Sequence, residues 1–168
     1  MQTNVKLSEI SIRTELRPGD IGYVTYLHGT LYNREHEFGI AFESYVASGL
    51  HDFYQQYDPE KDCVWVCEHE GKMVGFLVLM HRPGNAAQLR YFIISPAYRG
   101  VGLGRKLMKL FMDFFHAKGY RSAFLWTTSG LPAAAHLYKS VGFVLTEEVD
   151  STAFGIALKE QRYELRLA

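Results

Sequence analysis

The glycine-rich stretch IISPAYRGVGLGRK, residues 93–106, is the feature that most constrains how this chain can fold. An apolar strand pattern leads into it, and Pro96 ends that strand because proline has no N–H to donate to a neighbour. Three glycines then alternate from Gly100 to Gly104, which allows a tight turn and close approach of a ligand to the backbone. A helical pattern follows at once, and a helix start carries unpaired N–H groups and a positive dipole end. The stretch therefore predicts a phosphate or pyrophosphate site.

Two known phosphate-binding loops do not fit this stretch. The P-loop of NTPases requires lysine and then serine or threonine after its last glycine, and Arg105 and Lys106 stand there instead. The dinucleotide-binding pattern G-x-G-x-x-G belongs to an early βαβ unit, whereas R-G-x-G-x-G lies here in the middle of the chain. A glycine-rich turn without a ligand is the remaining alternative. Arg99 and Arg105, at the two ends of the loop, favour an anion over that alternative.

Helical and strand patterns alternate along the chain, with no internal repeat or linker. Helices are predicted over residues 21–35, 42–54, 104–118 and 132–140, with Asp20 as the N-cap of the first. Strands are predicted over residues 7–17, 63–69, 73–81, 88–94, 122–128, 143–149 and 158–167. This order predicts a single α+β domain over residues 1–168. Its mixed central sheet of about seven strands is flanked by helices on both sides, as a three-layer α/β arrangement.

Composition narrows the classes of partner. The 168 residues are 48% hydrophobic and 21% charged, and the formal net charge is zero. A nucleic-acid or anionic-membrane binder would show a basic excess, so neither partner is expected. Apolar runs such as residues 76–80 are far too short to span a bilayer, and residues 1–10 lack a signal-peptide pattern. We therefore expect a cytoplasmic protein.

The two cysteines, Cys63 and Cys67, lie on one predicted strand. Four residues of strand separate them by about 13 Å, whereas a disulfide requires Cα atoms within about 7 Å. We predict unpaired thiols in the core, on a buried face formed by residues 63, 65 and 67. Only His69 is near enough to add a metal ligand, so no metal site is expected.

Two motifs together resemble the GNAT acetyltransferase superfamily. The first is I-S-P-A-Y-R-G-V-G-L-G, residues 94–104, and the second is A-x-x-x-Y-x-x-x-G-F, residues 134–143. The two motifs occur in the same order as in the family, and the resemblance extends over nearly the full length of the chain. From Gly19 onward the chain is most similar to the acetyltransferase domain found fused behind MarR-type regulators, as in His28-Gly29-x-x-Tyr32. No winged helix-turn-helix precedes it here, so we expect the acetyltransferase part to stand alone.

The resemblance implies the GNAT acyl-CoA N-acyltransferase fold and acetyl-CoA as co-substrate, with no metal. In that family the loop N–H groups hold the pyrophosphate, and N–H groups at the end of the preceding strand serve the thioester carbonyl. The residues that would contact acetyl-CoA are Phe92, Ile93, Ile94, Arg99, Gly100, Val101, Gly102, Leu103, Gly104 and Arg105.

The resemblance also implies catalytic residues. Tyr138 stands where the family often has a tyrosine that protonates the departing thiolate, and a phenol holds its proton at neutral pH. Leu131 replaces an asparagine that often contacts pantetheine. For the base, His28 has a suitable intrinsic pKa and Glu43 would have one if buried. Both fall in the two helices that roof the acceptor pocket in the family. Water is the alternative route for the proton.

The predicted function is acetyl transfer from acetyl-CoA to a primary amine, by direct attack within a ternary complex. The acceptor is a small molecule or a protein amine, and the oligomeric state is left open between a monomer and a homodimer. The alternative function is a regulatory module that binds acyl-CoA without turnover. An intact Tyr138 and an intact loop at Arg99 favour the enzyme.

Overall fold

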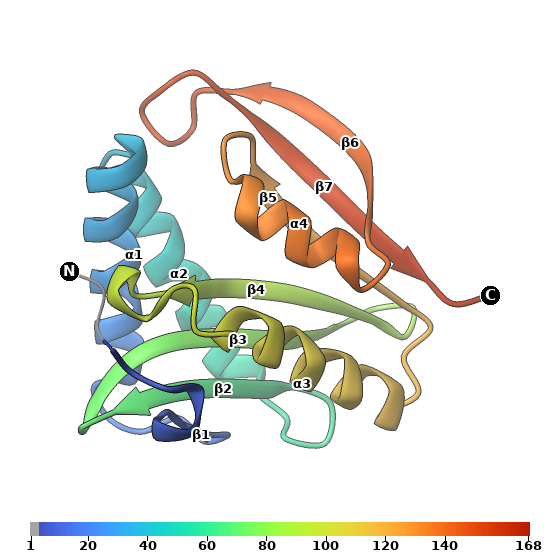
Figure 1. The fold of residues 1–168 in the computed structure, drawn as a ribbon. Helices are drawn as coiled ribbons and strands as arrows, with labels where there is room; N and C mark the ends of the chain where they lie inside the picture. The colour runs from blue at the N-terminus through green and yellow to red at the C-terminus, as the bar shows by residue number, and fades with distance from the viewer. Residues whose placement is uncertain (1–3) are drawn as a thin grey trace.

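A seven-stranded sheet forms the centre of the computed structural model, which describes residues 4–168 (Figure 1). The strand order is β1-β2-β3-β4-β5-β7-β6. The strands are β1 (Ser11–Arg13), β2 (Cys63–His69), β3 (Lys72–Arg82), β4 (Ala86–Ile94), β5 (Ser122–Thr128), β6 (Val144–Ser151) and β7 (Leu158–Arg166). Among the strands of the described residues, only β4 and β5 pair in parallel. The predicted mixed sheet is confirmed.

Four helices cover the two faces of the sheet. They are α1 (Asp20–His36), α2 (Ile40–Gln56), α3 (Leu103–Ala117) and α4 (Pro132–Ser140). Helices α1 and α2 pack on one face, and α3 and α4 lie on the other (Figure 1). No helix within residues 4–168 is both long and apolar enough to cross a membrane.

Strand β2 is buried on both faces, which corrects the expectation of one buried face. Residues 63, 65 and 67 join the core under α3, whereas Val64 and Val66 join the core under α1 and α2. A strand between two helical layers has no solvent face, so its apolar residues need not alternate. Cys63 and Cys67 are both buried and unpaired, as predicted.

The first strand is much shorter than predicted. Residues 7–17 contain a single 3₁₀ turn at Leu7–Glu9 and only three strand residues, Ser11–Arg13. Those three pair with Val66–Glu68 at the outer edge of the sheet. The chain then leaves the sheet because the Arg13 side chain turns toward the start of α1.

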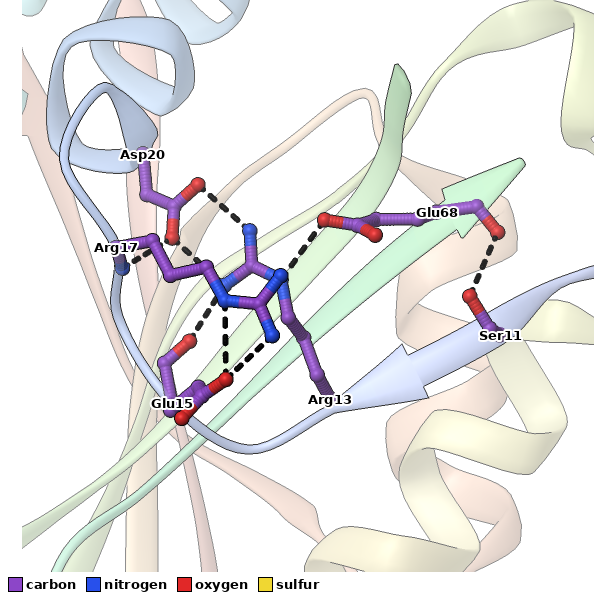
Figure 2. A network of polar contacts seen from close by, with 6 residues as sticks. All are labelled: Ser11, Arg13, Glu15, Arg17, Asp20 and Glu68. Carbon is purple, nitrogen blue, oxygen red and sulfur yellow. Dashed lines mark hydrogen bonds and ion pairs between the residues drawn. The ribbon is translucent and has the colours of Figure 1, made fainter. Parts of the chain in front are cut away.

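Arg13 links the N-terminal segment to α1 and β2 (Figure 2). Its guanidinium donates two hydrogen bonds of 2.8 Å to the Asp20 carboxylate and one of 2.7 Å to Glu68. Asp20 also accepts the backbone N–H of Arg17, while Gly19, with φ of 95°, is the N-cap of α1. The prediction of Asp20 as N-cap was therefore wrong by one residue. Burial by itself raises the pKa of Asp20, but these hydrogen bonds outweigh it and leave that pKa below its ordinary value.

Replacing Arg13 with alanine is expected to destabilise the fold. The Asp20 side chain is only 9% exposed, so Arg13→Ala would leave its carboxylate without an ion-pair partner in a partly dry site and lower the free energy of unfolding by about 3 kcal/mol. Because the pKa of Asp20 is depressed in the fold, this stabilisation is present near neutral pH and is lost as pH falls through that pKa. Urea unfolding at neutral and acidic pH measures both effects.

The matched control is Arg17→Ala. Arg17 pairs with Glu15 at the surface, where both side chains are more than half exposed, and such pairs contribute about 0–1 kcal/mol. If the two alanine variants lost the same free energy of unfolding, Arg13 would not be the residue that links the N-terminal segment to α1 and β2.

Strands β4 and β5 separate soon after they begin to pair. Only Ala86–Gln88 pair with Ser122–Phe124, although β4 continues to Ile94. Strand β4 carries an irregularity in its pairing with β3, and Tyr91 there adopts a left-handed φ of 57°. An extra residue in one strand bends it away from its neighbour. The far half of β4 therefore presents one backbone edge to a gap in the sheet.

Candidate active site

The glycine-rich loop leads into α3 at the end of β4, as predicted. Gly100 and Gly102 have φ of 79° and 94°, a backbone conformation that residues other than glycine rarely adopt. Gly102 is the N-cap of α3, and within residues 4–168 no side-chain cap bonds to the N–H groups of the first turn. A helix of fifteen residues thus begins with donors unoccupied by side chains and directed at the loop.

A cleft of about 640 Å³ opens beside this loop. We call it the loop cleft; the loop, the end of β4, the last turns of α1 and the start of α4 form its walls. Of the residues expected to contact acetyl-CoA, all but one line it: Phe92, Ile93, Ile94, Arg99, Gly100, Gly102, Leu103, Gly104 and Arg105. The exception is Val101, which packs against the core under α3.

Arg99 already has a partner in the loop cleft. Its guanidinium donates two hydrogen bonds, of 2.7 and 2.8 Å, to the carboxylate of Glu35 near the end of α1. These bonds lower the pKa of Glu35 against the opposing effect of burial. Glu35 is the last residue of the first predicted helix, and the sequence gives no sign of this pair. An anion that binds Arg99 must share it with Glu35 or replace Glu35.

Backbone donors of β4 face the gap in the sheet. Ser95 donates its N–H to Val74 of β3 at 2.9 Å. Because N–H groups alternate between the two edges of a regular strand, the N–H group of Ile94 belongs to the opposite edge. That edge is free of β5 beyond Gln88. The N–H group of Ile94 therefore lies on the side where a ligand can reach it.

A second, smaller cavity of about 140 Å³ lies between α1, α2, β4 and β5. We call it the aromatic pocket, because Tyr32, Phe42, Tyr91, Trp126 and Phe154 are among the side chains that line it. Tyr32, Phe92, Leu131 and Ala134 line both this pocket and the loop cleft. The two cavities thus meet at the gap between β4 and β5.

His28 lines the aromatic pocket and is 3% exposed. Its Nδ1 lies 2.8 Å from the carbonyl oxygen of Val24, which accepts only from a protonated nitrogen. The other nitrogen of the neutral ring, Nε2, therefore carries a lone pair. Burial lowers the pKa of His28 to about 4, so the ring is uncharged at neutral pH.

Tyr138 lies in α4 at the wall of the aromatic pocket, 5% exposed. Its ring is 6.2 Å from the ring of Phe92, and it also contacts Phe143 and Tyr163. Burial raises its pKa far above the ordinary value of a phenol, so the hydroxyl keeps its proton at any physiological pH. The family motif thus brings Tyr138 beside the strand that carries the predicted carbonyl donors.

Glu43 and Glu160 contrast in position. Glu43 lies outside both cavities, and its carboxylate occupies the space beside Gly29, where α1 and α2 touch. Glu160 lines the aromatic pocket from β7, where it pairs with Thr128 of β5. Nothing near Glu160 in the sequence marks it, because the pairing of β7 with β5 decides its place. Residues 4–168 contain no group of three or more acidic, histidine or cysteine side chains arranged to hold a metal.

Curated relatives of the chain are N-acetyltransferases. The uncharacterized N-acetyltransferase YjgM of Escherichia coli strain K12 is 32% identical over 113 residues, which are 64% of this chain and 68% of that protein. The N-acetylaspartate synthetase of Xenopus tropicalis is 32% identical over 103 residues, 60% of this chain. The match covers only 38% of that second relative.

Solved structures share the fold. An acetyltransferase from Streptococcus agalactiae 2603 superposes with a TM-score of 0.74 at 25% identity, over 96% of this chain and all of that one. The protein yncA of Salmonella typhimurium, solved with acetyl-CoA as its cofactor, superposes with a TM-score of 0.65 at 20% identity, over 95% of both chains. Residues 29–143, more than half of the sequence, match the family described as the acetyltransferase (GNAT) family. The chain therefore belongs to the GNAT family of acetyltransferases.

Proposed function

We propose that this protein transfers the acetyl group of acetyl-CoA to a primary amine, by direct attack in a ternary complex. The observation that carries the proposal is the meeting of the two cavities at Phe92 and Leu131. The loop cleft, with a volume of about 640 Å³, would take the nucleotide-bearing co-substrate, and the aromatic pocket would take the acceptor. Amine and thioester would then meet at the gap beside β4, where proximity supplies much of the rate.

The loop would hold the pyrophosphate through the N–H groups of residues 99–105. At the gap, the N–H of Ile94, with that of Phe92, would polarise the thioester carbonyl and stabilise the oxyanion of the tetrahedral intermediate. Collapse of that intermediate breaks the C–S bond. Tyr138 would then give its proton to the departing thiolate.

The amine must lose a proton before or during attack, and three side chains are candidates. His28 offers the lone pair of Nε2 in the aromatic pocket, although its lowered pKa makes it a weak base. Glu160 lines the same pocket as a carboxylate. Glu43, expected from the sequence, would act only through water, because it lies outside both cavities. Water alone remains the alternative.

Thermal shift and thiol release test this function together. Acetyl-CoA at 100 times its dissociation constant is expected to raise the free energy of unfolding by about 2.7 kcal/mol. NAD and ATP are expected to stabilise less, because the loop lacks their sequence patterns. Release of CoA that depends on an added amine shows turnover. Stabilisation by acetyl-CoA without release from any amine would favour a regulatory module, and equal shifts for ATP and acetyl-CoA would contradict the assignment of the loop.

A further inference from the structure

We infer that the acceptor carries a carboxylate that binds Arg90, so that the substrate is an amino acid and not a simple amine. The inference rests on the proposed function, because it names the acceptor of that reaction. It comes from the charges and walls of the aromatic pocket.

Arg90 is a half-buried cation of the aromatic pocket and has no acidic partner among residues 4–168. Its guanidinium lies 4.7 Å from the centre of the Tyr91 ring and 5.7 Å from that of Tyr45. One nitrogen donates a long hydrogen bond of 3.3 Å to the Tyr45 hydroxyl. The ion pairs formed within residues 4–168 do not include Arg90. A guanidinium that faces a pocket and keeps its donors available suits a planar carboxylate.

The position of Arg90 along the strands suits a substrate that reaches the reaction centre. Strands β4 and β5 last pair at Gln88 and Phe124. Four residues farther along each strand are Phe92 and Thr128, and Glu160 pairs with Thr128. Arg90 lies two residues before Phe92 on β4, and both residues line the aromatic pocket. A carboxylate held at Arg90 thus leaves the amine of the same small molecule near the level of Phe92.

The charges of the pocket match a zwitterion. Arg90 is positive and Glu160 is negative, while His28 is uncharged at neutral pH. A simple amine would gain nothing from Arg90, because its ammonium form is repelled there. The other walls are largely aromatic, with Phe42, Trp126 and Phe154 among them, and they suit an apolar side chain on the acceptor.

Matched pairs of acceptors test the inference. Phenylalanine with phenethylamine, and leucine with isoamylamine, share an amine and a side chain and differ by one carboxylate. A charge-assisted hydrogen-bonded contact contributes about 1.5–3 kcal/mol, so kcat/KM of the wild-type enzyme should favour the amino acid by about 10–100-fold. The readout is release of CoA from acetyl-CoA.

Arg90→Gln is expected to reduce that preference to about unity, because glutamine keeps some length and hydrogen bonding but loses the charge. Arg90→Lys keeps the charge without the planar fork, and it should retain part of the preference. If Arg90 served only to pack on Tyr45 and Tyr91, Arg90→Gln would lower the melting temperature and leave the ratio of the two substrates unchanged.

The outcomes separate the inference from the proposed function. Equal rates for both members of each pair, or faster acetylation of the simple amine, overturn the inference and leave amine acetylation standing. A preference that survives Arg90→Gln also overturns it. Failure to release CoA with every amine and amino acid overturns the proposed function and the inference together.

Discussion

Tyr138→Phe is expected to lower kcat by about 10²–10⁴-fold, the usual range for loss of a general acid. Affinity for acetyl-CoA should change little, because the proton is needed only when the thiolate leaves. The ring contacts with Phe92 and Phe143 do not involve the hydroxyl, so packing should be kept. Single-turnover kinetics together with calorimetry of acetyl-CoA binding measure the two quantities on one preparation.

Tyr163→Phe is the matched control for this prediction. Tyr163 is also buried and its ring lies 6.0 Å from that of Tyr138, but it lines neither the loop cleft nor the aromatic pocket. Removal of its hydroxyl should therefore leave kcat near that of the wild type. If Tyr138→Phe keeps the wild-type kcat on a verified acceptor, Tyr138 is not the acid and water delivers the proton.

Gly102→Val is expected to weaken acetyl-CoA binding by at least about 100-fold, since several charge-assisted contacts of about 1.5–3 kcal/mol would be disturbed. A branched side chain at the N-cap of α3 blocks close approach of phosphate to the backbone donors. It also forces valine into a φ of 94°, which lowers stability by about 1–3 kcal/mol. Calorimetry on the folded variant, below its melting temperature, measures the affinity.

Gly119→Val separates these two effects. Gly119 follows the other end of α3, has φ of 72°, and a Cβ there would meet nothing within 4 Å. This variant should lose comparable stability through the backbone and keep its affinity for acetyl-CoA. An equal loss of affinity in both valine variants would show that general destabilisation, and not the loop, explains the result for Gly102.

Local sequence was enough to predict the loop and the helix after it, whereas Tyr138 was singled out by the resemblance to the family. Glycine spacing and Pro96 act within a few residues of one another, so no knowledge of distant contacts is needed. The predicted order of strands and helices was also confirmed, because each element follows from the pattern of its own residues. The length of the first strand was not predicted correctly, because the end of that strand depends on the contacts of Arg13 with Asp20 and Glu68.

Contacts between distant elements could not be predicted. The pair of Arg99 with Glu35 joins residues 64 positions apart, and no spacing rule connects a loop to a helix that far upstream. Glu160 reaches the aromatic pocket only through the register of β7 on β5. Arg90 falls within the predicted strand over residues 88–94, and no motif marks it. Its place in the pocket follows from the separation of β4 from β5 after Gln88.

Burial of the two cysteines has a consequence for how the enzyme can be assayed and stored. Burial raises the pKa of both Cys63 and Cys67 to about 12, so almost no thiolate forms at the pH of a disulfide-exchange reagent. These are the only cysteines of the chain. While folded, the protein should therefore add almost no colour of its own to a thiol titration, and CoA would account for the signal. The same burial should protect the protein from oxidative dimerisation in air.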